Sequence, residues 1–308
     1  MKAARGQLAK NLAKDFERNK IAYLMFLPVF LYYAVFQWLP YGGLVIAFQK
    51  YNLFKGFLGS EWVGFDNFIQ FLTGPYFWRL LRNTFLLSFY SLIFGFPMPI
   101  IFALMLNELR PGNVKKVVQT ISYMPHFISL VVVCGMISDF SRERGLFNSI
   151  LGALGLPAAN LLSVPGLFRP IFIASGIWQG LGWGSIIYLA TLSSVDPNLY
   201  DAAEIDGAGR FRRILHVSLP ALMPVITVQF IMRVGQILSV GFEKVILLYN
   251  PMTYETADVI SSYLYRYGLL QANYSLGTAA GLFNSAINIA VLVTVNWLFK
   301  RFSRESLW

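Results

Sequence analysis

The chain has 308 residues, of which 56% are hydrophobic and 13% are charged, and its mean hydropathy is +0.56. A soluble core of this size could not hide so much apolar surface, so the composition excludes an ordinary soluble protein and indicates a membrane protein. The net charge of +10 is attributed to membrane topology and lipid contact and not to nucleic acid, which requires a soluble basic face. A single cysteine, Cys134, excludes a disulfide framework and a cysteine-based metal site.

Residues 1–20 are basic and are expected to form a cytosolic segment. The apolar stretch that follows, Ile21–Gln49, is about twice as long as the apolar core of a signal peptide, and no small-residue cleavage site follows it. We therefore expect it to remain attached as the first membrane span. Together with an aromatic and glycine-rich external loop it forms a first unit, 21–81. A core domain, 82–299, which contains a cytosolic loop over 196–220, and a cytosolic tail, 300–308, follow.

The core domain contains four further charge-free stretches that are each long enough to cross about 30 Å of hydrocarbon as a helix. A sixth span is expected at Leu222–Leu248, although charges interrupt it, because charged groups in a span are tolerated where they face a cavity or a partner. Pro125 and His126 are expected to interrupt the helix of the third span. The four charge-free stretches are Asn83–Asn107, Val117–Ser138, Pro170–Val195 and Tyr267–Phe299.

The segment Gly145–Phe168 is also free of charge, but its glycines, prolines and asparagines disfavour a continuous helix. We interpret it as an interfacial or re-entrant piece outside the membrane. With six spans and both termini in the cytosol, the inner segments hold fifteen lysines and arginines and the outer segments hold eight. This bias favours that orientation.

Motifs for several kinds of catalysis are missing from the sequence. No segment matches the phosphate-binding pattern GxxxxGK[ST], no histidine lies in HExxH, and no serine lies in GxSxG. The acidic residues lie in loops and tails, apart from Glu243 beside Lys244, and show no convergent pair within the spans. A membrane enzyme that uses carboxylates alone stays open at this point.

The segment YDAAEIDGAGRFRRILHVSLP, Tyr200–Pro220, concentrates charge between the fourth and fifth spans. Residues 199–205 are predicted to form a short helix, followed by a turn at Gly207 and Gly209 and a second short helix over 211–218. In the second helix Phe211, Ile214 and Leu215 are expected to face inward, while Arg210 and Arg213 form the polar face. Such a cytosolic hairpin would present a shaped, charged surface to a soluble partner.

This segment resembles the EAA loop of permeases of binding-protein-dependent ABC importers, in which Glu-Ala-Ala precedes a glycine and a closing Leu-Pro. Asp201 stands where the family usually has Glu, so the carboxylate is kept with a shorter reach. The pieces WVGFDNF, NTF and ALMLNE are similar to parts of sugar permeases of the maltose-permease type. By this resemblance the surface that couples to the ATPase comprises Asp201, Ala202, Ala203, Glu204, Asp206, Gly207, Arg210, Leu219 and Pro220.

The resemblance implies an all-α, polytopic membrane helical bundle of about six transmembrane helices with the type I importer permease fold. It also implies a bacterial cytoplasmic membrane, a second permease subunit, two ATPase subunits that hold ATP and Mg²⁺, and an extracytoplasmic solute-binding protein. No catalytic residue, metal or cofactor is expected in this chain. The function that it implies is import of an oligosaccharide or polysaccharide by alternating access. The alternatives are an ABC permease for a non-sugar solute and a membrane enzyme acting on lipid-linked sugars.

Polar and aromatic residues in the last three spans are candidates for the sugar path. Four polar residues recur at steps of four, three and seven, which places them on one stripe of the predicted fifth helix. The alternative for all of these residues is a role in packing between helices. The candidates are Gln229, Arg233, Gln236 and Glu243 on the stripe, Asn284 and Asn288 in the sixth span, and Trp178 and Trp183 in the fourth.

Overall fold

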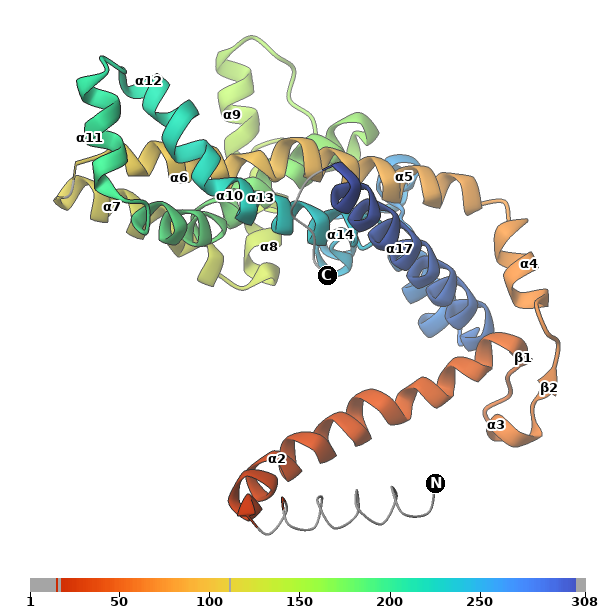
Figure 1. The fold of residues 1–308 in the computed structure, drawn as a ribbon. Helices are drawn as coiled ribbons and strands as arrows, with labels where there is room; N and C mark the ends of the chain where they lie inside the picture. Colours follow the sequence, from red (N-terminus) through yellow and green to blue (C-terminus); the bar gives the residue numbers. More distant parts are fainter. Residues whose placement is uncertain (1–14, 16–17, 111, 303–308) are drawn as a thin grey trace.

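The computed structural model describes residues 15, 18–110 and 112–302 (Figure 1). Over these ranges the chain is helical almost throughout, as predicted, and one small antiparallel sheet joins β1 (Gln49–Lys50) to β2 (Glu61–Trp62). Most of the predicted basic segment 1–20, and the tail from residue 303, lie outside the described residues. The smaller helices that link the spans are α3 (Gly56–Gly59), α4 (Asp66–Leu72), α9 (Leu146–Ala153), α15 (Tyr254–Ala257) and α16 (Ile260–Tyr263).

Four helices in the described part of the chain are long and apolar enough to cross a membrane. The first predicted span agrees with one of them to within a residue at each end. The second begins at Phe77, earlier than expected, so the boundary expected near Arg82 between the first unit and the core domain falls inside a helix. The first is Lys20–Phe48, made of α2 (Lys20–Tyr33), η1 (Ala34–Trp38) and η2 (Leu39–Phe48), and the second is Phe77–Asn107, made of α5 (Phe77–Tyr90), η3 (Ser91–Gly95) and α6 (Pro97–Asn107). The third is Arg210–Val234, made of α12 (Arg210–Arg213), η6 (Ile214–Ser218) and α13 (Leu219–Val234), and the fourth is Tyr274–Arg301 in α17 (Tyr274–Phe302).

The predicted fourth span lies in α10 (Pro165–Ser193), which has 29 residues and is long enough to cross a bilayer. It is not among the four apolar helices, because its glycines, tryptophans and Gln179 lower its mean hydropathy. Gly145–Phe168 forms no continuous helix, as predicted, since α9 ends at Ala153 and α10 begins only at Pro165. Helix α10 packs against α6, α7 and α13 and so occupies the middle of the bundle.

The third predicted span, Val117–Ser138, is not one helix. It is divided between α7 (Asn113–Tyr123), the short turn η4 (Met124–Phe127) and α8 (Leu130–Ser141). The helical part that ends at Phe127 and the part that begins at Leu130 are bent by 97° relative to each other. Pro125 lacks a backbone N–H, and Ile128 after it is extended, so the interruption expected at this proline is a sharp corner.

Two further predicted spans have different limits in the structure. The fifth begins at Arg210 and ends at Val234, and α14 (Phe242–Leu248) is a separate short helix after a turn. The prediction of one helix over Leu222–Leu248 is therefore wrong. The sixth span, expected from Tyr267, begins at Tyr274, because η8 (Leu264–Leu270) ends in a turn where Ala272 has a φ of 54°.

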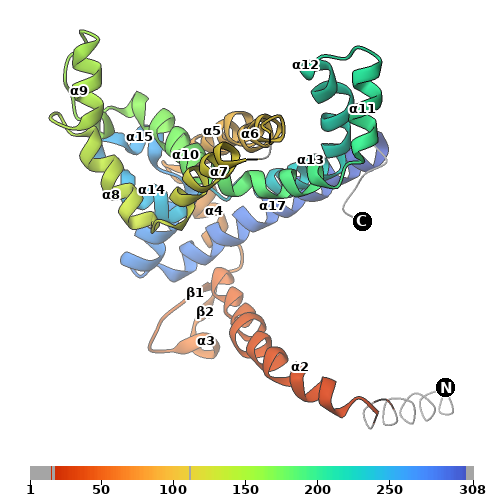
Figure 2. The same ribbon diagram turned by 90° about the vertical axis from the view of Figure 1, so that its left-hand side faces the viewer.

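The first span stands apart from the rest of the chain in both views (Figures 1 and 2). None of its most apolar 18-residue window is buried, and η2 (Leu39–Phe48) at its end packs against α17 and α4. So much exposed apolar surface requires contact with lipid or with another protein.

A buried polar cluster fixes the loops opposite the hairpin end of the bundle. Asp258 is fully buried, and its Oδ2 accepts from Arg266 at 2.7 Å and from Arg79 at 3.1 Å, while Ser262 donates to its Oδ1 at 2.7 Å. Asn83 donates to the Asp258 carbonyl at 3.0 Å. The cluster thereby ties α5 to the chain around α15 and α16.

Asp258→Asn is expected to lower the stability of the folded chain by about 3 kcal/mol, because it leaves two arginines without their buried counter-charge. Thermal unfolding of the detergent-solubilised protein, followed by the loss of its monodisperse peak, measures the change. Asp139→Asn is the control, since Asp139 pairs with Arg142 at 3.3 Å on the surface, where ion pairs contribute little. Equal melting temperatures for the two variants would contradict the structural role given to Asp258.

Candidate functional site

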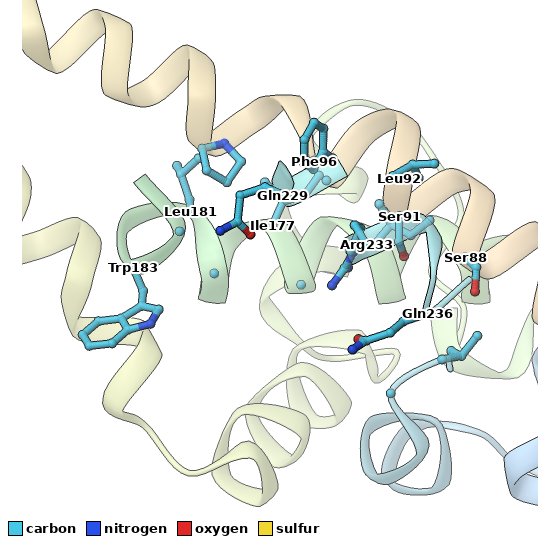
Figure 3. Close-up of a pocket in the computed structure, with 18 of the residues that line it drawn as sticks. Ser88, Ser91, Leu92, Phe96, Ile177, Leu181, Trp183, Gln229, Arg233 and Gln236 are labelled. Atoms are coloured by element: carbon cyan, nitrogen blue, oxygen red, sulfur yellow. The ribbon is translucent and has the colours of Figure 1, made fainter. Parts of the chain in front are cut away.

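A cavity of about 780 Å³ lies between the central helices (Figure 3). Its walls come from the helix Phe77–Asn107, from α10, from α13, and from the chain that runs from α13 into α14. On α10 the lining residues Gly176, Gly180 and Gly184 recur at every fourth position, which opens one face of that helix to the space. A Cβ atom on Gly180 would meet no atom within 4 Å, so the absence of a side chain there adds to the cavity.

Three of the predicted path residues line this cavity from α13 and the turn that follows it. Gln229 and Arg233 lie on α13, and Gln236 lies in the turn that follows it. In Figure 3 their polar ends follow one another along the cavity, and Trp183 lies at the opposite end from Ser88. The prediction that these residues share one stripe is confirmed for Gln229 and Arg233, which are one turn apart on a continuous helix.

Glu243 does not belong to the polar row, defined as Gln229, Arg233 and Gln236. The helix ends at Val234, so the period used for the prediction does not extend to Glu243, which is exposed in the first turn of α14 and does not line the cavity. Lys244, the next residue, lines the cavity instead. Sequence reasoning did not select Lys244 as a path residue, although a lysine inside a largely apolar stretch was a usable signal.

Of the four remaining candidates, three lie outside the cavity and one lines it. Asn288 accepts from the Leu238 backbone N–H at 3.0 Å and donates to the Ser239 hydroxyl at 3.1 Å, which favours the packing alternative for this residue. Asn284 and Trp178 do not line the cavity. Trp183 does, and its ring stacks on His126 with centroids 4.5 Å apart and an interplanar angle of 3°. The broken third span thus supplies the support for this indole.

The charged hairpin forms at the far end of the same bundle. Helix α11 (Pro197–Ile205) is capped by Asp196, whose carboxylate accepts from the Asn198 backbone N–H at 3.0 Å, as is usual for a helix N-cap. The turn after α11 contains Gly207 with a φ of 75°, a conformation that favours glycine. The first half of the predicted hairpin is therefore confirmed.

The second half differs from the prediction. The expected short helix over 211–218 is the beginning of the 25-residue helix that continues through Pro220 to Val234. Phe211 and Leu215 are exposed, whereas Arg213 is turned inward. Arg213 donates to Glu204 at 2.8 Å and lies 4.0 Å from Glu108, so it joins α11 and the end of α6. The predicted faces are therefore wrong for Phe211, Leu215 and Arg213, whereas Arg210 is exposed and Ile214 is half-buried, as expected.

The surface of the hairpin combines charge with exposed apolar groups. Ile205 and Phe211 are exposed on either side of the turn, and Tyr200 makes a 3.0 Å hydrogen bond with the buried Ser218 that holds the two helices together. Ala203 and Leu219 are half-buried. The other predicted coupling residues are exposed: Asp201, Ala202, Glu204, Asp206, Gly207, Arg210 and Pro220. This combination of charge and exposed apolar area is typical of a surface that binds another protein.

Comparison with known proteins adds to this geometry. Residues 21–304 match the model of the family described as "Binding-protein-dependent transport system inner membrane component". The chain belongs to this family. It is therefore a membrane-spanning permease of the ABC transporter class, and it has the type I importer permease fold and is not an enzyme.

Two relatives from Bacillus subtilis (strain 168) are each 42% identical to the permease. They are the protein LplB, over 95% of this chain and 92% of the relative, and the polygalacturonan/rhamnogalacturonan transport system permease protein YteP, over 97% and 94%. A solved bacterial ABC transporter involved in the import of the acidic polysaccharide alginate contains a chain 43% identical to the permease. The two chains superpose with a TM-score of 0.88, and the alignment covers 94% of this chain and 99% of the other.

Proposed function

We propose that the permease imports an oligosaccharide through the central cavity by alternating access. The observation that carries the proposal is the single helix Arg210–Val234, which begins in the exposed hairpin and ends at the cavity wall with Arg233. A movement imposed on the hairpin therefore reaches the polar row directly. The names of the relatives, which refer to transport of sugar polymers, support the substrate class. The amide, hydroxyl and aromatic groups that line the cavity suit the hydroxyls and apolar faces of a sugar.

The proposed assembly contains a second permease, two ATPase subunits on the hairpin side, and an extracytoplasmic solute-binding protein. A solved alginate transporter was crystallised in complex with an alginate pentasaccharide-bound periplasmic protein, which supports the last of these partners. The distribution of lysine and arginine supports cytosolic termini and a cytosolic hairpin. The exposed first span offers the apolar surface that a second permease or lipid would cover.

An ABC permease for a non-sugar solute is the alternative within the family. No comparison favours a membrane enzyme acting on lipid-linked sugars, and family membership opposes it. Uptake of labelled oligosaccharides by proteoliposomes that contain the complete transporter tests the proposal. ATP-dependent uptake of amino acids or peptides, with no uptake of any sugar, would reject it in favour of the alternative.

The purified chain alone is expected to hydrolyse no ATP, because its sequence contains no GxxxxGK[ST] phosphate-binding loop. Phosphate release by the isolated chain in nanodiscs, compared with release by the complete transporter at equal protein concentration, measures this. The control is a preparation whose co-purified ATPases have been removed by a second affinity step. Turnover that survives this step at the rate of the complete transporter would contradict the assignment of hydrolysis to a separate subunit.

A further inference from the structure

The charge of the cavity lining is one-sided. Its lining residues include two basic side chains, Arg233 and Lys244, and no aspartate or glutamate. The other polar side chains in the lining are neutral: Ser88, Ser91, Trp183, Tyr188, Gln229, Gln236 and Ser239. A neutral sugar requires no positive charge in the wall of its path. Charged groups inside a membrane protein are energetically costly and are usually found where they have a functional role.

Lys244 is the more demanding of the two cations. Only 7% of the residue is exposed, and its Nζ donates to the Phe172 carbonyl at 2.8 Å and lies 4.8 Å from the centroid of the Phe172 ring. No carboxylate in the described part of the chain lies within ion-pair distance of this ammonium group. An ammonium group has three donors, so one carbonyl leaves it incompletely satisfied on the side of the cavity.

Room for this lysine is built into the neighbouring helix. Gly176 of α10 faces Lys244, and a Cβ atom at position 176 would lie 3.2 Å from the Lys244 Nζ. A side chain on α10 at this point would crowd the ammonium group. The glycine therefore leaves room for a positive charge that is largely buried at the wall of the cavity.

Arg233 supplies a second donor group on the same cavity. It is exposed at the end of α13, and none of the ion pairs within the described ranges includes it. A guanidinium presents a planar fork of N–H donors that fits both oxygens of a carboxylate. Gln236, in the turn after the same helix, adds an amide donor beside it.

We propose that Arg233 and Lys244 form a carboxylate-binding wall, and that the transported sugar is therefore an acidic oligosaccharide whose uronate groups pair with them in turn. This inference rests on the proposed function, because it specifies the substrate class of the same cavity. The names of two similar proteins give alginate, an acidic polysaccharide, and polygalacturonan/rhamnogalacturonan, which contain galacturonate units, and this agrees with the charge of the wall.

The test compares an oligouronide with its carboxyl-reduced form, which has the same length and linkage but bears hydroxymethyl groups. Equilibrium binding of both sugars to the complete transporter is measured by calorimetry without the solute-binding protein, so that the selectivity of that protein does not enter. The unaltered transporter is expected to bind the oligouronide at least tenfold more tightly. Lys244→Met and Arg233→Gln are each expected to reduce this preference about tenfold while leaving the affinity for the reduced sugar unchanged.

Lys55→Met and Arg142→Gln, at exposed positions away from the cavity, are the matched controls and should keep the preference. Lys244→Arg, which retains the charge, should keep most of it. Equal binding of both sugars by the unaltered transporter, or equal losses for both sugars in the variants, would overturn the inference. If ATP-driven uptake of the reduced sugar matches that of the oligouronide, the inference fails and the proposed function stands. If neither sugar is bound or taken up, the proposed function fails as well.

Discussion

Gly207→Asp is expected to abolish sugar-stimulated ATP hydrolysis by the reconstituted transporter and to loosen its ATPase subunits. Gly207 has a φ of 75° at the tip of the hairpin, next to the exposed Ile205 and near Phe211. A Cβ atom at Gly207 would meet nothing within 4 Å in this chain, so the effect comes from strain in the backbone and from contact with the partner. A carboxylate that a docking groove must desolvate without a counter-charge carries a penalty of several kcal/mol, on the order of 3 kcal/mol or more.

Three controls separate these causes. Gly207→Asn has nearly the same shape without charge and tolerates a positive φ, so it should retain most of the coupling. Gly209→Ala, at a position with a φ of −66°, should be neutral, and Asp201→Glu should be tolerated because the carboxylate is kept. ATPase rates with and without sugar, together with co-purification of the ATPases, give the readout. Full coupling in Gly207→Asp would remove the docking role of this turn.

Gly180→Phe is expected to reduce sugar uptake by at least tenfold while leaving assembly of the transporter intact. Gly180 lines the cavity, and an added Cβ atom would meet no atom within 4 Å, so a larger side chain can enter the space without displacing the helices. The obstruction should grow from Ala to Leu to Phe, because each step fills more of the cavity. Initial rates of uptake in proteoliposomes measure the series.

Gly152→Phe, in α9 and outside the cavity, is the matched control because its Cβ atom would also meet nothing within 4 Å. Size-exclusion profiles of both variants check the assembly. Undiminished uptake by a well-assembled Gly180→Phe transporter would show that the sugar follows another route.

The sequence was sufficient to predict the helical membrane bundle and the position of the hairpin, but not the length of its second helix. Leu-Pro at 219–220 predicts the end of a helix, because proline lacks a backbone N–H donor. In the structure η6 (Ile214–Ser218) is a π-helical turn, and the Leu219 N–H donates to the carbonyl of Ile214, five residues back. This wider turn lets the helix pass through Pro220. A local register change of this kind has no signature in residue type.

The end of the polar row was unpredictable for a different reason. Periodicity alone carries the stripe from Gln236 to Glu243, but the helix stops at Val234. A Cβ atom at Gly235 would lie 2.5 Å from the Leu292 side chain, so the residue that follows α13 packs against α17 without room for a side chain. Because this contact joins residues far apart in sequence, only the fold reveals that Lys244 takes the place expected for Glu243.

The continuity of the helix from Arg210 to Val234 makes it a lever arm. Its 25 residues extend over about 37 Å at 1.5 Å per residue, so a tilt of about 10° about the hairpin end moves the cavity end by about 6 Å. That displacement is about twice the length of a hydrogen bond. Arg233 would be carried out of reach of a bound sugar without any change of its own rotamer. A single tilt of this helix can then link closure of the ATPases at the hairpin to release of the sugar in the cavity.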